Sequence, residues 1–323
     1  MPLVTSLSYP DSSFVTRLTA PQFPQSCASA PAKRARALSA AHIIMCFVQR
    51  LVIGTLVVLT FCNAEAQGWE LVHLSDRYPR ALCSDRSSAA YYYRAGRDHD
   101  DQSSTVILVQ QGGFWCWDSE SCERRWDYWS KPAHRAMWKG KHLMSSKYLD
   151  KKTLNGNPPA GMFEASSRNP FQNASIFYIP YCSSDAWTGS SRDDSASRFV
   201  YRGHDIVRAV LAEIRTQVGN TFRNLLVTGT SAGGLGTVLN TDLAAGMFPE
   251  TRVLGIPDAG WFLDVNPAGP CQMSSPAMWD CTEESGKVIA LRAQFEAGFT
   301  MWNAVTAMPL PCRSRTDAWR CLF

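Results

Sequence analysis

The sequence has few histidines and almost no excess charge. No two cysteines show a C-x-x-C spacing with a histidine nearby, so no zinc site is expected, and no other metal or cofactor. The formal net charge is +4, but residues 1–66 carry five basic and two acidic residues and account for +3 of it. The rest holds 27 basic and 26 acidic residues, and a nearly neutral domain of this kind does not indicate nucleic-acid binding.

A hydrophobic run long enough for a membrane span is also missing. The apolar residues 51–62 fall short of the roughly 20 that a spanning helix needs. They follow Arg50 and precede Ala64-Glu65-Ala66, a pattern typical of signal peptidase sites. We therefore expect a signal peptide at 45–66 that starts at Met45, after a low-complexity and disordered extension at 1–44. The alternative is a signal anchor over residues 38–62, and only then would the chain contact a membrane.

Residues 67–323 are expected to form one secreted, disulfide-bonded domain. An even number of cysteines behind a signal peptide indicates disulfides. The sequence Asn173-Ala174-Ser175 is an N-glycosylation motif. The eight cysteines of this part are Cys83, Cys116, Cys122, Cys182, Cys271, Cys281, Cys312 and Cys321.

The chain contains a nucleophile elbow around Ser231. A short run rich in Leu and Val at 224–228 predicts a strand, residues 229–234 read Gly-Thr-Ser-Ala-Gly-Gly, and a helix is predicted to follow. In the G-x-S-x-G pattern the serine lies on a tight strand-to-helix turn, and the start of the helix offers free N–H groups to a developing oxyanion. Ser231 is therefore the predicted nucleophile. The alternative is a glycine turn with an incidental serine.

Strands are predicted to alternate with helices along the domain. Beyond a short strand at 89–94 in an otherwise irregular stretch, apolar runs predict strands at 105–110, 175–181 and 252–257. Apolar spacings of one, three and four predict a helix over 203–218. This order is typical of an α/β fold, with a mostly parallel sheet and helices on both faces. Candidate site residues follow four of these strands, where the carboxyl ends of parallel strands meet: Gly112, Gly113, Asp185, Ser231 and Asp258.

The chain lacks a base for this serine. In hydrolases with a nucleophile elbow, the catalytic residues follow one another along the chain in the order serine, acid, histidine. All six histidines of this sequence precede Ser231: His42, His73, His99, His134, His142 and His204. We expect His204 to be a surface residue, and Asp258 to bond backbone N–H groups of the turn after it rather than to act as the acid. Because the sequence stops on the apolar residues Leu322 and Phe323, we expect a truncated chain that lacks the last strands of the fold.

Four segments together resemble one family, the pectin acetylesterase/Notum family. They are QGGFWC (111–116), IPYCSSDAWTG (179–189), GTSAGG (229–234) and DAGWFLD (258–264). The resemblance runs from about residue 83 to residue 323. It implies an α/β-hydrolase-like fold and a Ser-Asp-His triad with Ser231 as the nucleophile, the acid and base lying beyond Phe323. It further implies an oxyanion hole formed by the backbone N–H groups of Gly113, Phe114 and Ala232.

The resemblance also implies disulfides and a substrate class. Cys83 would pair with Cys182 and Cys116 with Cys122, while the pairing of the last four cysteines stays open, with Cys312–Cys321 as a guess. Gln111 and Phe114 stand where the family often has Glu and Trp. The implied activity is that of a secreted serine carboxylesterase that removes acyl groups from polysaccharide or protein, with acetyl esters favoured, although this chain alone is expected to hydrolyse little. The alternatives are a palmitoleoyl-protein carboxylesterase and a catalytically inactive glycan- or acyl-binding protein of the same fold.

Overall fold

The computed structural model describes residues 68–97, 104–137, 139–155, 161–164, 166–192, 196–220, 222–262 and 291–322. All of them belong to one compact unit, residues 64–323. The predicted extension at 1–44 and signal peptide at 45–66 lie outside the described residues. Within those residues, no helix combines the length and the hydrophobicity that crossing a membrane requires.

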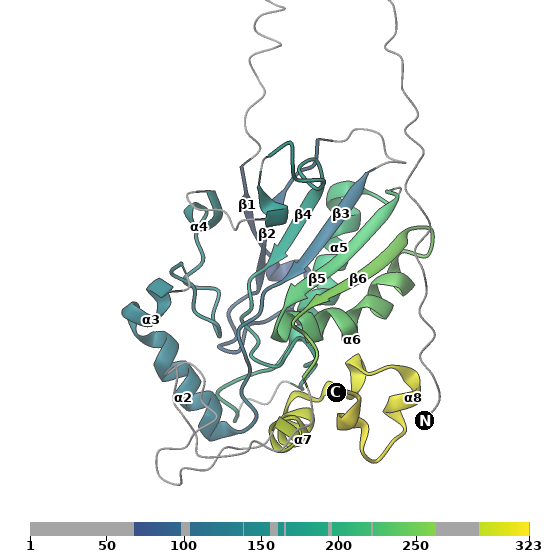
Figure 1. Ribbon diagram of the computed structural model, residues 1–323. Helices are drawn as coiled ribbons and strands as arrows, with labels where there is room; N and C mark the ends of the chain where they lie inside the picture. The colour runs from purple at the N-terminus through teal and green to yellow at the C-terminus, as the bar shows by residue number, and fades with distance from the viewer. Residues whose placement is uncertain are drawn as a thin grey trace, which may run out of the picture. The chain divides into compact units, whose positions relative to one another are not determined.

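A six-stranded mixed sheet forms the centre of the molecule, in the order β1-β2-β4-β3-β5-β6 (Figure 1). Strand β1 pairs antiparallel with β2, and β2 pairs antiparallel with β4, whereas the last four strands are mutually parallel. The strands are β1 (Glu70–His73), β2 (Ala90–Arg94), β3 (Thr105–Gln110), β4 (Ser175–Ile179), β5 (Asn224–Thr230) and β6 (Arg252–Asp258).

Two long helices cover one face of the sheet. They are α5 (Gly203–Val218) and α6 (Ala232–Met247), which lie behind the strands in Figure 1. Shorter elements lie beyond the sheet or on its other face: α2 (Ser119–Ser130), α3 (Pro132–Met137), α4 (Lys152–Asn155), α7 (Leu291–Trp302) and α8 (Leu310–Arg313). Four 3₁₀ turns complete the described elements: η1 (Ser75–Arg77), η2 (Gly161–Phe163), η3 (Ala304–Ala307) and η4 (Ala318–Leu322).

Both faces of the inner strands are buried. Side chains alternate along a strand, so Leu108 of β3 packs in the large core under α5 and α6 while its neighbour Ile107 packs in a second cluster on the opposite face. Phe163 of η2 and Leu154 of α4 close that second cluster. The near-continuous apolar runs of the sequence are explained by this double burial.

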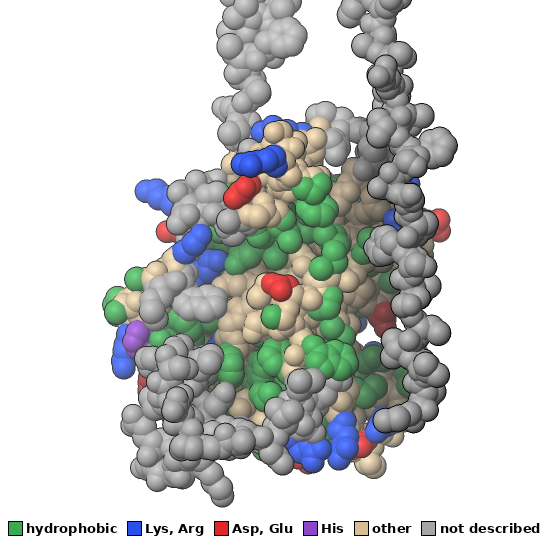
Figure 2. Space-filling view, viewed as in Figure 1, with side chains coloured by type: hydrophobic (Ala, Val, Ile, Leu, Met, Phe, Trp, Pro, Cys, Tyr) green, Lys and Arg blue, Asp and Glu red, His purple; other side chains and the backbone are tan. Residues whose placement is uncertain are grey.

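The strand β6 is different, because it is the last in the order of the described strands and is largely exposed. Leu254 is 39% and Ile256 is 51% exposed. Figure 2 shows apolar side chains gathered on the face of the sheet turned to the viewer, the face opposite α5 and α6. The carboxyl end of β6 is nevertheless tied to the inner sheet through its ladder with β5, in which Thr230 pairs with Asp258.

A lysine lies buried beside the second core cluster. Lys141 is 5% exposed, and its Nζ donates to the hydroxyl of Tyr178 (3.1 Å) and lies 4.6 Å from the centre of that ring. Burial lowers the pKa of Lys141 from 10.5 to about 7, and the neighbouring charge of Lys139 acts in the same direction. The ammonium form is therefore disfavoured in the folded protein.

Lys141→Met is expected to stabilise the protein most at neutral pH. Between pH 7 and 10.5 the unfolded wild type binds a proton that the folded wild type does not, so wild-type stability falls as the pH is lowered. Methionine carries no such proton. The advantage of the variant should therefore grow by about 1 kcal/mol per pH unit from pH 9.5 down to pH 7.5 in urea unfolding. Lys147→Met, which changes an exposed lysine, is the control, and an advantage independent of pH would contradict the expectation.

Candidate active site

Ser231 lies on a tight turn between β5 and α6. Its φ and ψ are 58° and −121°, a left-handed region that costs energy for any residue with a side chain. Its backbone N–H donates to the carbonyl oxygen of Asp258 (2.9 Å) at the end of β6. The side chain is half-buried. The strand and the helix thus present the hydroxyl at the carboxyl end of the sheet.

The glycines of this turn are required by close backbone contacts. A Cβ on Gly233 would lie 2.0 Å from the carbonyl oxygen of Gln110, and one on Gly229 would lie 2.4 Å from the same atom. A Cβ on Gly234 would lie 2.5 Å from the carbonyl oxygen of Asp258. The turn is therefore pressed directly against the ends of both neighbouring strands, β3 and β6.

The glycine loop after β3 touches the nucleophile turn. A Cβ on Gly112 would lie 2.2 Å from the carbonyl oxygen of Thr230 and 3.3 Å from the Cβ of Ser231. The next two residues have positive φ, 144° for Gly113 and 63° for Phe114. The structure thus brings together two of the predicted segments, the glycine loop and the elbow. Ala232 begins α6 beside them, where the first N–H groups of a helix have no partner within that helix.

Asp185 is fully buried and holds the loop after β4. Its carboxylate accepts from the hydroxyl of Ser183 (2.6 Å) and from the N–H groups of Trp187 (3.1 Å) and Gly203 (2.7 Å). Burial raises the pKa of Asp185, and these hydrogen bonds oppose that rise. The indole N–H of Trp187 in turn donates to the carbonyl oxygen of Gln111 (3.0 Å). Asp185 therefore supports the glycine loop through Trp187.

Asp258 bonds the nucleophile turn from the β6 side. Its Oδ2 accepts from the hydroxyl of Thr230 (2.9 Å). The sequence had instead predicted that the Asp258 carboxylate bonds backbone N–H groups in the turn that follows β6. Together with the bond from the Ser231 N–H to its carbonyl oxygen, the contact with Thr230 joins β6 to both residues at the tip of the turn.

The expectation that His204 lies at the surface is wrong. The residue is 5% exposed, packed where α5 meets α6, and its Nδ1 lies 2.8 Å from Oδ1 of Asn240. Burial lowers its pKa.

The other histidines with hydrogen bonds are also bound elsewhere. The ring of His134 bonds the carbonyl oxygen of Tyr128, and that of His142 accepts from the N–H of Met144. Over the described parts of the chain, no hydrogen bond joins a histidine to Ser231.

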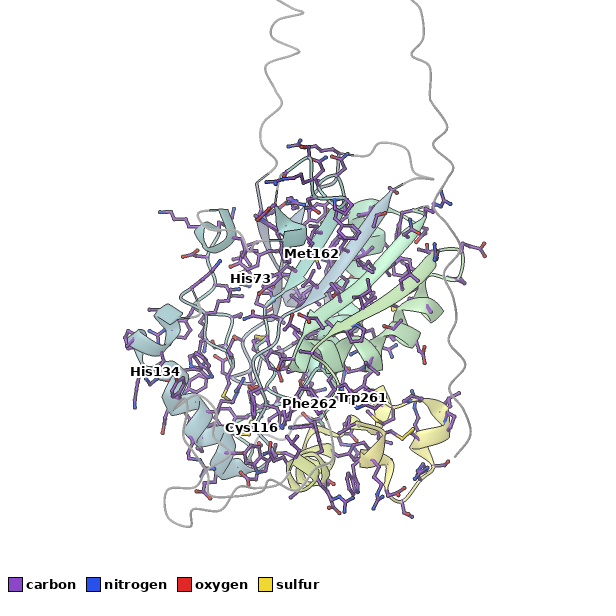
Figure 3. All side chains as sticks on the ribbon, in the orientation of Figure 1. His73, Cys116, His134, Met162, Trp261 and Phe262 are labelled. Carbon is purple, nitrogen blue, oxygen red and sulfur yellow. A yellow bond between two sulfur atoms is a disulfide. The ribbon has the colours of Figure 1, made fainter. Side chains whose placement is uncertain are left out.

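Aromatic rings pack beside the glycine loop. Phe114 stacks on Trp115 with ring centres 4.9 Å apart, and Trp115 also contacts Phe262 (5.1 Å) and Phe295 of α7 (4.8 Å). Figure 3 places Phe262 and Trp261 between the ends of the strands and α7. Trp261 itself is 72% exposed. The sequence predicted that the segments after β3 and β6 gather at the carboxyl end of the sheet, but it did not predict which rings would pack together.

Three disulfides lie among the described residues. They join Cys83 to Cys182 and Cys116 to Cys122, the pairs that the resemblance implied, and Cys312 to Cys321. Cys271 and Cys281 lie outside the described residues. Asn173, the predicted glycosylation site, lies half-buried just before β4. Among the residues described, no cluster of His, Cys, Asp and Glu could hold a metal ion.

A family model decides the classification. The model of the family described as Pectinacetylesterase matches residues 62–323. The chain belongs to the pectinacetylesterase family. Family membership places it among serine carboxylesterases of the pectin acetylesterase and Notum type.

Individual relatives of this family member are Notum proteins. The chain is 30% identical over 251 residues to palmitoleoyl-protein carboxylesterase notum1 of Xenopus laevis, covering 75% of this chain and 45% of that protein. The chain is also 30% identical to palmitoleoyl-protein carboxylesterase NOTUM of Homo sapiens, over 75% of this chain and 44% of that protein. The chain thus spans about half the length of the curated relatives it matches.

The fold agrees with that of a solved family member. The structure of the Wnt deacylase Notum from Drosophila matches with a TM-score of 0.62 at 27% identity, over 79% of this chain and 66% of that one. The mostly parallel α/β sheet is therefore that of the Notum α/β hydrolases.

Proposed function

We propose that this chain provides the nucleophile and the oxyanion hole of a secreted serine carboxylesterase. Ser231 Oγ attacks the ester carbonyl carbon and loses its proton to a base, and the N–H groups of Gly113, Phe114 and Ala232 bind the oxyanion. The bond to the alcohol then breaks, the alcohol oxygen takes up a proton, and water attacks the acyl-serine to release the acid. The conformation of Ser231, half-buried on a strained turn against Gly112, is the observation that supports this most directly.

The proposed substrates are acetyl esters of a polysaccharide or a protein, with no role for nucleic acid. The relatives' names give palmitoleoyl-protein as their substrate. We favour the shorter acyl group here because aromatic side chains of the protein itself pack beside the glycine loop, where Trp115 contacts Phe114, Phe262 and Phe295. The three disulfides support an extracellular location, since disulfides persist in oxidising compartments.

A non-catalytic glycan- or acyl-binding protein of the same fold is the second candidate. One observation favours it, namely that no histidine of the described residues bonds Ser231. In this case the same turn and N–H groups would bind an ester or glycan without cleaving it.

Acetyl transfer to Ser231 tests the two candidates. The purified protein and Ser231→Ala are incubated with p-nitrophenyl acetate, and the release of nitrophenol and the mass of the peptide that contains residue 231 are followed. We expect an acetyl group on Ser231 of the wild type and slow turnover, because nitrophenolate leaves without a proton while hydrolysis of the acyl-serine needs a base.

The outcomes separate the candidates. Release and acetylation that disappear in Ser231→Ala support the esterase proposal, and the same assay with longer p-nitrophenyl esters then measures acyl preference. If the two proteins behave alike, the esterase proposal is overturned. Binding of acetylated pectin by both, measured by calorimetry, would then favour the binding protein.

A further inference from the structure

The peptide between Gly113 and Phe114 is held in a costly orientation. Phe114 has a φ of 63°, which costs a residue with a side chain roughly 1–2 kcal/mol. Rotating this peptide by about half a turn would bring Phe114 to a negative, relaxed φ. The same rotation would also exchange the directions of the Gly113 carbonyl oxygen and the Phe114 N–H, because the two point to opposite sides of a trans peptide. Some contact must therefore oppose the rotation.

The side chain of Arg125 makes that contact. Its Nη2 donates to the carbonyl oxygen of Gly113 (2.6 Å), and its Nε donates to the hydroxyl of Ser184 (2.7 Å). Ser184 donates onward to the carbonyl oxygen of Leu143 (3.0 Å). The guanidinium is planar and fixes its N–H groups in a rigid fork, so bonding Ser184 sets the direction in which Nη2 points.

The helix that carries Arg125 is itself anchored next to the glycine loop. Arg125 lies three residues after Cys122, which is joined to Cys116 by a disulfide. Asp118 caps the helix by accepting from the N–H of Ser121 (2.7 Å). The first turns of α2 are thus fixed to the end of the same loop whose peptide Arg125 holds.

The hydrogen bond between Arg125 and Gly113 is buried. Arg125 is 1% exposed, and its guanidinium lies 6.0 Å from the ring centre of Tyr181. Desolvation lowers its pKa to about 10, which still leaves it charged at neutral pH. A buried charge bonded to a carbonyl oxygen makes a stronger hydrogen bond than a neutral donor does. The hydrogen bond to Gly113 therefore opposes the rotation that would relax Phe114.

We propose that Arg125 is a positioning residue, which holds the Gly113 carbonyl oxygen so that the Phe114 N–H points into the oxyanion hole. This rests on the proposed function, because the orientation matters to chemistry only if an ester carbonyl is bound beside Ser231. Arg125 acts from behind the loop, through the peptide, and does not contact the substrate.

The test compares Arg125→Met with Arg125→Lys. Methionine has a similar length but no donor, so we expect the maximal rate of Ser231 acetylation to fall by about tenfold to a hundredfold, with the half-saturating ester concentration little changed. Lysine keeps the charge and one donor group and should recover part of the rate. A crystal structure of Arg125→Met should show the Gly113 carbonyl oxygen turned away from its present direction.

A matched control separates this role from a general loss of stability. Arg94 is also buried, 8% exposed, and donates to a backbone carbonyl oxygen, that of Phe163 (2.7 Å). It lies at the other end of the sheet, because it pairs with Ile176 at the start of β4. Arg94→Met should lower stability but leave the acetylation rate unchanged.

Each result decides the proposal. A folded Arg125→Met with the wild-type rate, or with the Gly113 peptide unmoved, overturns it. If the wild type acetylates no faster than Ser231→Ala, the proposed function fails, and the crystal structure alone then decides whether Arg125 sets the peptide. Should Arg125→Met not fold, Arg125→Gln, which is polar but too short to reach Gly113, takes its place in both measurements.

Discussion

Gly233→Ala is expected to lower the free energy of unfolding by about 3 kcal/mol or more and to abolish acetyl transfer to Ser231. The added Cβ would lie 2.0 Å from the Gln110 carbonyl oxygen and 2.8 Å from its carbon, and both are backbone atoms of a central strand. Backbone cannot move aside as a flexible side chain does, so β3 and the nucleophile turn must separate. Moving Ser231 by even an ångström costs about a hundredfold in rate. Urea unfolding and the acetylation assay measure the two losses.

Gly246→Ala in the same helix is the matched control and should act in the opposite direction. A Cβ at Gly246 meets nothing within 4 Å. Alanine favours the helix by about 0.5–1 kcal/mol over glycine, so this variant should be more stable and equally reactive. A Gly233→Ala protein as stable as Gly246→Ala would contradict the 2.0 Å approach of this Cβ to the Gln110 carbonyl oxygen.

Removing the disulfide between Cys83 and Cys182 should cost about 4–5 kcal/mol, the largest loss expected for any of these variants. The bond joins residues 99 positions apart. Closing so long a loop lowers the conformational entropy of the unfolded chain strongly and thereby stabilises the folded state. Both cysteines are buried, and the N–H of Ser84 donates to the carbonyl oxygen of Cys182 beside the bond. The measurement is urea unfolding of the double variant Cys83→Ala/Cys182→Ala.

The bond between Cys116 and Cys122 provides the comparison. It joins residues only 6 positions apart, so closing this short loop contributes only about 2 kcal/mol to the free energy of unfolding. Both of its cysteines are also buried, so replacing this pair by alanine removes the same buried atoms as replacing the other pair. Because this bond anchors α2 to the glycine loop, its loss should slow Ser231 acetylation more than the loss of the longer one. Equal losses of stability in the two double variants would contradict the entropic argument.

The sequence predicted the inner strands and α5 well because their signals are local. The run at 105–110 coincides with β3, and the spacing over 203–218 coincides with α5. By contrast, β1 was missed, since only four residues pair at the outer edge of the sheet and two of them are exposed. The mostly parallel sheet itself was confirmed by the agreement with the solved Notum structure.

The missed features depend on contacts between distant parts of the chain. His204 has polar neighbours in sequence, but it packs against Asn240 across two helices, which no spacing reveals. The hydrogen bond from Arg125 to Gly113 joins a side chain to a backbone oxygen, and a backbone acceptor leaves no mark in residue type. The roles of Ser231, Gly113, Phe114 and Ala232 stay predictions, supported by the way the elbow and the glycine loop meet.

The bond from the Ser231 N–H to the Asp258 carbonyl oxygen links the nucleophile to local unfolding of the sheet edge. Edge strands with exposed side chains open at lower free energy than strands buried on both sides. Leu254 and Ile256 give β6 this exposed character, whereas β3 and β5 are enclosed. Among the described residues, the serine turn is therefore joined on one side to a buried strand, β3, and on the other to an exposed one, β6, and we expect a further strand paired with β6 to steady the geometry at Ser231 without touching it.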